Sequence, residues 1–237
     1  MPCNELRSSD RIKFLVLTGG PGAGKTAVME AARQIFAQEV AILPEAASIV
    51  YAGGFPRLGT RASIHAAQRA IASVQAELER FTLEDRTAPI ALCDRAIVDG
   101  AAYWPEGPEA FYAALGTTPE QVFARYTTVI HLRTPNLNMG YNNHANPMRT
   151  ESAEQAAELD RRIEEVWAGH PNRLVVPATE TFTEKLEHVT SLIRAELLLR
   201  GFPRLAMSAT GTASQPADSS TIYKNPETHK NPVELRP

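Results

Sequence analysis

The residues with the clearest chemical meaning form a glycine-rich stretch near the start of the chain. Residues 19–26 read GGPGAGKT, which fits the pattern G-x-x-x-x-G-K-[ST] of a phosphate-binding loop, or P-loop. Glycines let the backbone fold tightly around phosphates, with several N–H groups aimed inward as an anion-binding nest. Lys25 offers an ammonium to the outer phosphates, and Thr26 offers a hydroxyl to Mg²⁺. The predicted nucleotide-binding residues are Gly19, Gly20, Pro21, Gly22, Ala23, Gly24, Lys25 and Thr26.

The flanking segments are those that such a loop requires. Residues 12–17 form a mostly apolar run typical of a strand covered on both faces. Residues 27–33 are mostly good helix formers, and the predicted helix ends near Gln38. A chance match to the motif would not need a strand before it and a helix after it. The N-terminal end of that helix adds a favourable dipole for an anion.

The rest of the chain alternates between the two kinds of element. Further strands are predicted at 40–43, 89–93, 128–132 and 173–176. Helices are predicted at 46–51, 61–81, 96–103, 109–115, 152–168 and 181–200, with another short one opening at residues 118–120. The helix over 61–81 is expected to place Ile64, Ala67, Ile71, Val74, Leu78 and Phe81 on one face. Such alternation predicts an α/β fold with a parallel sheet wrapped on both faces, and ligands at the carboxyl ends of its strands.

Charged groups stand at two of these strand ends. Asp94 is placed to hold Mg²⁺ directly or through water, although an aspartate here could also cap a turn. Glu45 is a candidate general base for an acceptor hydroxyl, or else a first-turn glutamate favoured by the helix dipole. Arg95 could clamp a transferring phosphoryl group or simply serve as an ion-pair partner.

Other polar residues are weaker candidates. Asp99 and Tyr103 lie four residues apart on one predicted helix face and could line an acceptor pocket, although Tyr103 could equally well be a packing residue. The polar loop over 136–147 and the helix after it belong to a possible lid, which would bring an arginine onto the phosphates. The lid candidates are Arg133, Arg149, Arg161 and Arg162, each of which could also be ordinary solvated surface. His131, inside a strand, is expected to be a satisfied core residue.

Composition restricts the class of protein. The chain has 237 residues, enough for one sizeable domain or at most two small ones, and its formal net charge of -3 and 43% hydrophobic content are ordinary for a soluble globular protein. Nothing in the charge indicates a nucleic-acid surface, and no segment is apolar for long enough to span a membrane. The only cysteines, Cys3 and Cys93, do not suggest a disulfide framework, and no secretory signal is recognised, so a cytoplasmic setting is expected. We expect a mobile segment over 1–10, a nucleotide-binding domain over 11–201 and a disordered tail over 202–237.

Several motifs together resemble one known group. The P-loop, the Pro44-Glu45-Ala46 segment, the residues from Cys93 to Tyr103 and the Asn146-Pro147 to Glu151 segment resemble compact AAA-type P-loop proteins related to the nicotinamide riboside kinase domain. More distantly, they resemble deoxynucleoside and thymidylate kinases. The resemblance covers roughly residues 11–200. It implies a P-loop NTPase three-layer sandwich with a five-stranded parallel sheet, ATP and Mg²⁺ at the loop, a carboxylate at Glu45 or Asp94 near an acceptor hydroxyl, and a kinase-like lid carrying arginines.

Two functions follow as hypotheses. The first is an ATP-dependent small-molecule kinase acting on a nucleoside-like or other hydroxyl acceptor. Lys25, Glu45, Asp94, Arg95, Arg149 and Arg161 are then the catalytic candidates, and Thr26 and Asp94 the metal-binding ones. The second is a nucleotide-dependent switch that hydrolyses ATP or GTP slowly and binds a protein or lipid partner. The sequence leaves the acceptor, the purine and the oligomeric state open.

Overall fold

The fold is described from a computed structural model, which covers residues 12–135, 152–178 and 181–199. The chain divides into two units, Met1–Pro203 and Arg204–Pro237, and all of the described residues belong to the first. The predicted mobile segment at 1–10, the predicted tail at 202–237 and Arg149 therefore lie outside the described residues. None of the helices among the described residues combines the length and apolar character needed to cross a membrane.

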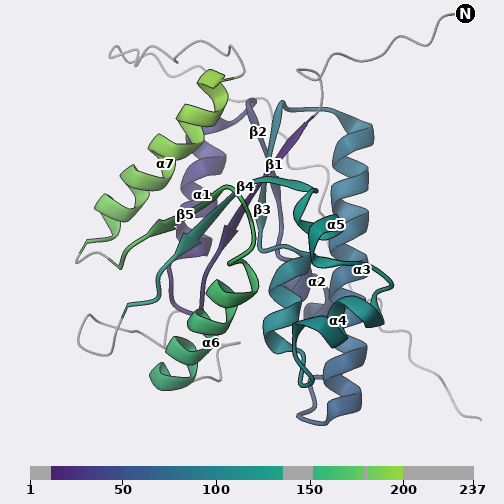
Figure 1. The fold of residues 1–237 in the computed structure, drawn as a ribbon. Coiled ribbons are helices and arrows are strands. Elements are labelled where there is room, and N and C mark those ends of the chain that lie inside the picture. The colour runs from purple at the N-terminus through teal and green to yellow at the C-terminus, as the bar shows by residue number, and fades with distance from the viewer. Residues whose placement is uncertain (1–11, 136–151, 179–180, 200–237) are drawn as a thin grey trace, which may run out of the picture. The chain divides into compact units, whose positions relative to one another are not determined.

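Five parallel strands form one sheet in the described part of the chain, in the order β2-β3-β1-β4-β5. The strands are β1 (Lys13–Thr18), β2 (Val40–Leu43), β3 (Ile90–Asp94), β4 (Tyr126–Leu132) and β5 (Arg173–Val176). The α-helices are α1 (Lys25–Phe36), α2 (Ala46–Ala52), α3 (Arg61–Asp85), α4 (Pro108–Ala114), α5 (Pro119–Phe123), α6 (Ala153–Val166) and α7 (Phe182–Leu199), and a 3₁₀ helix, η2, spans Ile97–Tyr103. The predicted α/β architecture with a five-stranded parallel sheet is confirmed (Figure 1).

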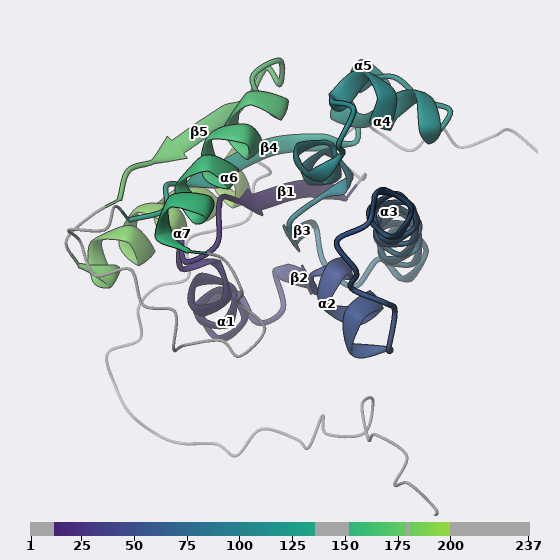
Figure 2. The same ribbon diagram turned by 90° about the horizontal axis from the view of Figure 1, so that it is seen from below.

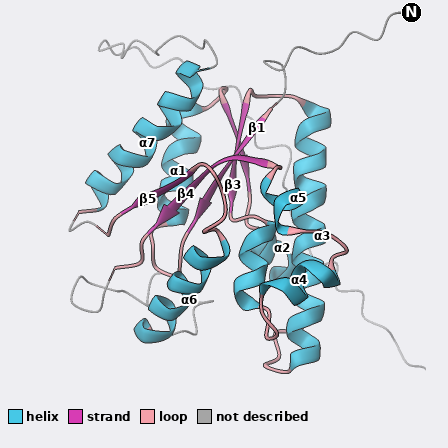
Figure 3. Ribbon diagram, in the orientation of Figure 1, coloured by secondary structure: helices cyan, strands magenta, loops and turns pink. Residues whose placement is uncertain are grey.

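Helices cover both faces of the sheet, which makes three layers. Buried residues of α1 and α7 belong to one core, and buried residues of α3, α4, α5 and α6 belong to the other. Figure 2, seen from below, shows α1 and α3 well apart from each other. Alternate residues of β1 supply the two cores: Leu15 and Leu17 pack with α1 and α7, whereas Phe14 and Val16 pack with η2 and the helices around it. Because every strand runs in the same direction, the carboxyl ends of all five meet at one edge (Figure 3).

The long helix α3 differs from its sequence-based prediction. Phe81, expected on the buried face, is 64% exposed. Of the other expected residues, Ala67 is buried, and Ile64, Ile71, Val74 and Leu78 are half-buried. The further buried positions are Gln68, Ala72, Gln75, Glu79 and Thr82. Glu79 can lie in the core because Arg125 and the Tyr126 hydroxyl both donate hydrogen bonds to its carboxylate. The apolar periodicity therefore located the helix and most of its inward face correctly, but it was wrong for Phe81 and missed the buried Glu79.

Candidate nucleotide-binding site

The P-loop lies between the end of β1 and the start of α1, as predicted. Gly19, Gly22 and Gly24 all have positive φ angles, of 135°, 81° and 94°. A side chain on Gly19 would also be excluded by space, since its Cβ would lie 2.1 Å from the carbonyl oxygen of Leu132 on β4. The loop can therefore turn this sharply against the sheet only where glycine stands.

Lys25 opens α1 and is held by the loop itself. Its Nζ donates to the carbonyl oxygens of Gly19, at 2.9 Å, and Gly20, at 3.0 Å. Burial and the nearby Arg95 lower the pKa of Lys25 to about 8, although neighbouring carboxylates oppose the shift. A triphosphate would supply the negative charge that this desolvated ammonium lacks. Thr26, the next residue, is exposed and lines the same cavity.

Asp94 ends β3 directly beside β1, where Leu17 is its register partner. Its Oδ1 is buried and has no hydrogen-bond partner among the described residues. Burial raises the pKa of Asp94 to about 6, and the opposing charges of Lys25 and Arg95 only partly offset it. An unpaired carboxylate oxygen on the same cavity as the hydroxyl of Thr26 is the kind of ligand set that Mg²⁺ prefers, so these residues fit the predicted metal site.

Glu45, Arg95 and Asp99 form a connected group at the end of β2 and β3. Arg95 Nε donates to Glu45 Oε1 at 2.9 Å, and Arg95 Nη1 donates to Asp99 Oδ1 at 3.2 Å. The Ser48 hydroxyl donates to the other oxygen of Glu45. Burial on its own raises the pKa of Glu45, but Arg95 and Ser48 outweigh it, so this pKa lies below its ordinary value. Glu45 is therefore an ionised carboxylate at the cavity wall.

Asp99 was predicted as a possible pocket residue, and it does border the cavity. However, it is only 3% exposed and its oxygens are already used. Besides Arg95, it accepts hydrogen bonds from the Thr18 hydroxyl, the Ala96 N–H and the Trp167 indole N–H. This arrangement makes Asp99 the support that fixes Arg95 and the end of β1.

One cavity of about 500 Å³ joins these groups. Its lining includes the P-loop, Glu45, Asp94 and Arg95, and also residues of α2, α3 and η2, and we call this last part of the lining the second arm. The residues lining this second arm are Tyr51, Arg57, Leu58, Ser63, Ile64, Gln68, Ile71, Gln75, Gly100 and Tyr103. The predicted Lys25, Thr26, Glu45, Asp94 and Arg95 are thus brought together at one place.

The predicted lid arginines that the structure describes, Arg133, Arg161 and Arg162, do not border this cavity. Arg161 lies on the exposed side of α6, where it pairs with Glu158 and Glu165 on the same helix. Arg133, at the end of β4, pairs with Glu164. Neither borders the cavity, and a role of Arg161 over the phosphates stays a prediction.

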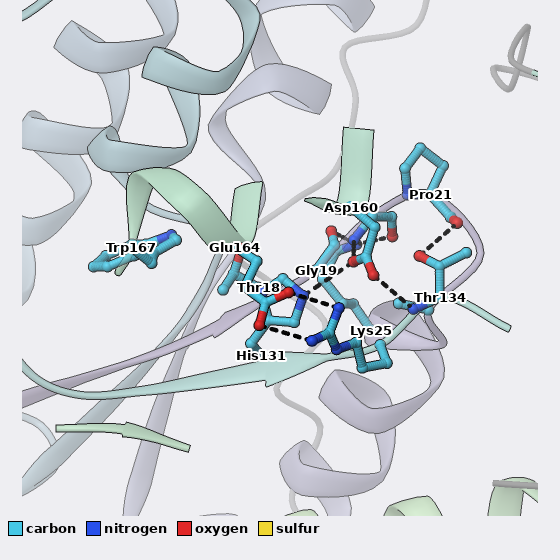
Figure 4. Close-up of polar contacts among 12 residues, drawn as sticks. Thr18, Gly19, Pro21, Lys25, His131, Thr134, Asp160, Glu164 and Trp167 are labelled. Carbon is cyan, nitrogen blue, oxygen red and sulfur yellow. Dashed lines mark hydrogen bonds and ion pairs between the residues drawn. The ribbon is translucent and has the colours of Figure 1, made fainter. Parts of the chain in front are cut away.

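The sequence analysis missed Asp160, a neighbour of Arg161 on α6. Figure 4 shows its carboxylate between the P-loop and the end of β4, and Gly20 N–H donates to it at 2.7 Å. His131 was expected to be a satisfied core residue, but only its Nε2 is bonded, to Asp160 at 3.0 Å, while its Nδ1 has no partner among the described residues. A signal for Asp160 did exist, because it lies on the same helical face as the buried Ala156, Ile163 and Trp167.

Comparison with known proteins agrees with this geometry. No curated protein matches the chain. Residues 14–185, more than half of the chain, match the family described as AAA domain. The matched range starts in β1, contains the whole P-loop and the ends of all five strands, and extends into α7. The chain therefore belongs to the AAA domain family, and it is a P-loop protein of the nucleotide-binding class.

Proposed function

We propose that the protein is an ATP-dependent kinase that transfers the γ-phosphoryl group to a hydroxyl of a small, nucleoside-like or other acceptor. The observation that supports this most is the extent of the cavity. Its P-loop end has the chemistry for a triphosphate, and the arm between α2, α3 and η2 leaves space for a second small molecule. A protein that only bound or hydrolysed a nucleotide would not need this second arm.

The second arm has the chemistry of a pocket for a small polar molecule. Tyr51 and Tyr103 offer aromatic surface, and Ile64 and Ile71 offer apolar surface. Gln68, which is 7% exposed, adds the polar amide of its side chain to this wall of the cavity. Ligand pockets commonly combine apolar walls with a few such polar groups.

Glu45 lines the same cavity as the P-loop and the second arm, and it is the proposed general base. In the transfer step, the acceptor oxygen bonds to the γ-phosphorus while its proton passes to the Glu45 carboxylate. The bond between that phosphorus and the bridging β-phosphate oxygen breaks, and ADP leaves. Lys25 binds the outer phosphates, and Arg95 orients Glu45 beside the reacting groups. Thr26 and Asp94 would hold Mg²⁺, which neutralises charge on the phosphates.

A screen of acceptors tests this proposal. Release of ADP is measured with ATP and Mg²⁺ in the presence of nucleosides, sugars and other small alcohols, and one class should raise the turnover sharply. Glu45→Gln should abolish this stimulation, whereas Glu30→Gln, on the exposed side of α1, should not. Turnover that responds to no small molecule but rises with a protein or a lipid vesicle would favour the nucleotide-dependent switch instead.

A further inference from the structure

Two buried charged side chains contact the P-loop from outside the cavity. Asp160 on α6 is 5% exposed, and Lys185 on α7 is 4% exposed. Neither borders the cavity, so neither is placed to touch a nucleotide in it. Burying a charge is costly unless hydrogen bonds compensate for it. In both residues, the compensating partners include backbone groups of the loop.

Asp160 fixes the orientation of one peptide unit of the loop. Its Oδ1 accepts the Gly20 N–H at 2.7 Å. A trans peptide is planar, so the Gly19 carbonyl of the same unit must point in the opposite direction. That carbonyl accepts the Lys25 ammonium at 2.9 Å. The carboxylate of Asp160 therefore determines where one of the two acceptors of Lys25 stands.

The position of Asp160 is itself well determined. Its Oδ2 accepts the Thr134 N–H at 3.2 Å, and its Oδ1 also contacts His131 Nε2 at 3.0 Å. The Thr134 hydroxyl in turn donates to the carbonyl of Pro21 (Figure 4). Gly20 packs so closely here that an added Cβ would lie 2.8 Å from the Cβ of Asp160. The loop is thus fitted against α6 and the end of β4 with no room to shift.

Lys185 does the same for a second peptide unit. Its Nζ donates to the carbonyl oxygens of Ala23 and Arg133, both at 2.9 Å. The Gly24 N–H belongs to the same peptide unit as the Ala23 carbonyl, so it must point away from Lys185. Gly24 borders the cavity, and its N–H makes no hydrogen bond within the described part of the chain. This N–H is therefore available to a phosphate oxygen.

We infer that Asp160 and Lys185 are positioning residues that hold the P-loop in its phosphate-binding shape. Asp160 acts through the Gly19 carbonyl on Lys25, and Lys185 acts through the Ala23 carbonyl on the Gly24 N–H. The inference rests on nucleotide binding by the P-loop and does not depend on a kinase reaction. Its tests measure binding alone, so they remain valid whether or not an acceptor is ever phosphorylated.

The first test is a double-mutant cycle between Asp160 and Lys25, read as ATP·Mg²⁺ affinity by calorimetry. Asp160→Asn keeps the size of the side chain but offers a single acceptor oxygen to three donors. We expect it to weaken ATP binding about tenfold in the parent protein, the usual value of a hydrogen bond to a charged group. In the Lys25→Ala background, Asp160→Asn should weaken ATP binding less than about twofold, because Lys25, the residue through which Asp160 acts, is absent. Equal losses in both backgrounds, or no loss in either, would overturn the inference.

A second variant and a second readout keep the test independent of folding defects. Lys185→Met should also weaken ATP binding about tenfold, but by the same factor with and without Lys25, since it acts on Gly24. Amide hydrogen exchange at Gly20 should speed up in Asp160→Asn at a temperature where the variant is folded. If ATP binding to Lys25→Ala is too weak to measure, faster amide exchange at Gly20 in Asp160→Asn would support the inference, and unchanged exchange would overturn it.

The matched control is Glu196→Gln on α7. Glu196 is also partly buried and charged, but it contacts Thr128 on β4 and Lys13 on β1 rather than the loop. The Glu196→Gln variant should have a lower melting temperature, with ATP affinity and the amide exchange of Gly20 unchanged. If Glu196→Gln weakened ATP binding as much as Asp160→Asn, the effect would be general loosening of the domain, and Asp160 would not be a positioning residue.

Discussion

Titration of Lys25 should control the pH dependence of nucleotide binding. The pKa of this ammonium is lowered from 10.5 to about 8 by burial and by Arg95. In the free protein it therefore loses its proton as the pH rises through about 8. Bound phosphates favour the charged form, so the complex keeps the proton to a higher pH. Binding of a nucleotide above pH 8 must then take up a proton.

The size of the effect follows from this pKa. At pH 9 only about one tenth of the free protein has a charged Lys25, so binding should take up about 0.9 proton. Over the same range, affinity should fall about tenfold for each pH unit above 8. At pH 7 the lysine is charged in both states, and its contribution to proton uptake should vanish.

Calorimetry in buffers of different ionisation enthalpy measures the proton uptake directly. The titration uses ATP and Mg²⁺ at pH values from 7 to 9.5, where the triphosphate itself is almost fully ionised at the upper end. Lys25→Arg is the control, because arginine stays charged across this range and its binding should take up no proton at pH 9. An affinity that stayed constant from pH 7.5 to 9.5, with no proton uptake, would refute the assigned role of Lys25.

Three further predictions concern the neighbouring residues. Asp94→Asn should remove the Mg²⁺ dependence of ATP binding, and an unchanged Mg²⁺ effect in this variant would place the metal elsewhere. In the parent protein the Mg²⁺ dependence should fade as the pH drops through about 6, because protonation of Asp94 removes the negative charge of the ligand. Glu45→Gln should bind ATP·Mg²⁺ normally but lower acceptor-dependent turnover about 10²–10⁴-fold, and turnover at the parental rate would show that Glu45 is not the base. Trp167→Ala should destabilise the fold by about 3–5 kcal/mol in denaturant unfolding, since this side chain is fully buried and its indole supports Asp99; a loss below 1 kcal/mol would show that the site collapses around the gap.

The elements and the P-loop were predictable because their signals are local. Four consecutive apolar residues over 40–43 are sufficient to indicate β2, and the spacing of glycines with Lys25 and Thr26 is sufficient to indicate the loop. Glu45 and Asp94 could be selected because parallel strands bring their carboxyl ends to one edge, which is a rule about topology that needs no side-chain geometry.

The remaining parts depend on contacts between distant residues. Gly20 and Asp160 are 140 positions apart, and no local pattern indicates that a helical aspartate accepts a P-loop N–H. On α3, the burial of Glu79 was missed for a related reason. Glu79 reads as a surface residue until Arg125 and Tyr126 are seen to compensate its charge. Polar residues in the interior are thus the ones that sequence periodicity assigns to the wrong face.

The central claim is that the two arms of the cavity serve one phosphoryl transfer between two small molecules. Its most direct test follows the fate of the γ-phosphoryl group by ³¹P NMR in a reaction with ATP, Mg²⁺ and the acceptor that gives the highest turnover. A new phosphate ester signal should grow in step with ADP and should be lost in Glu45→Gln. Appearance of the γ-phosphate only as inorganic phosphate, at a rate that no small molecule changes, would contradict it.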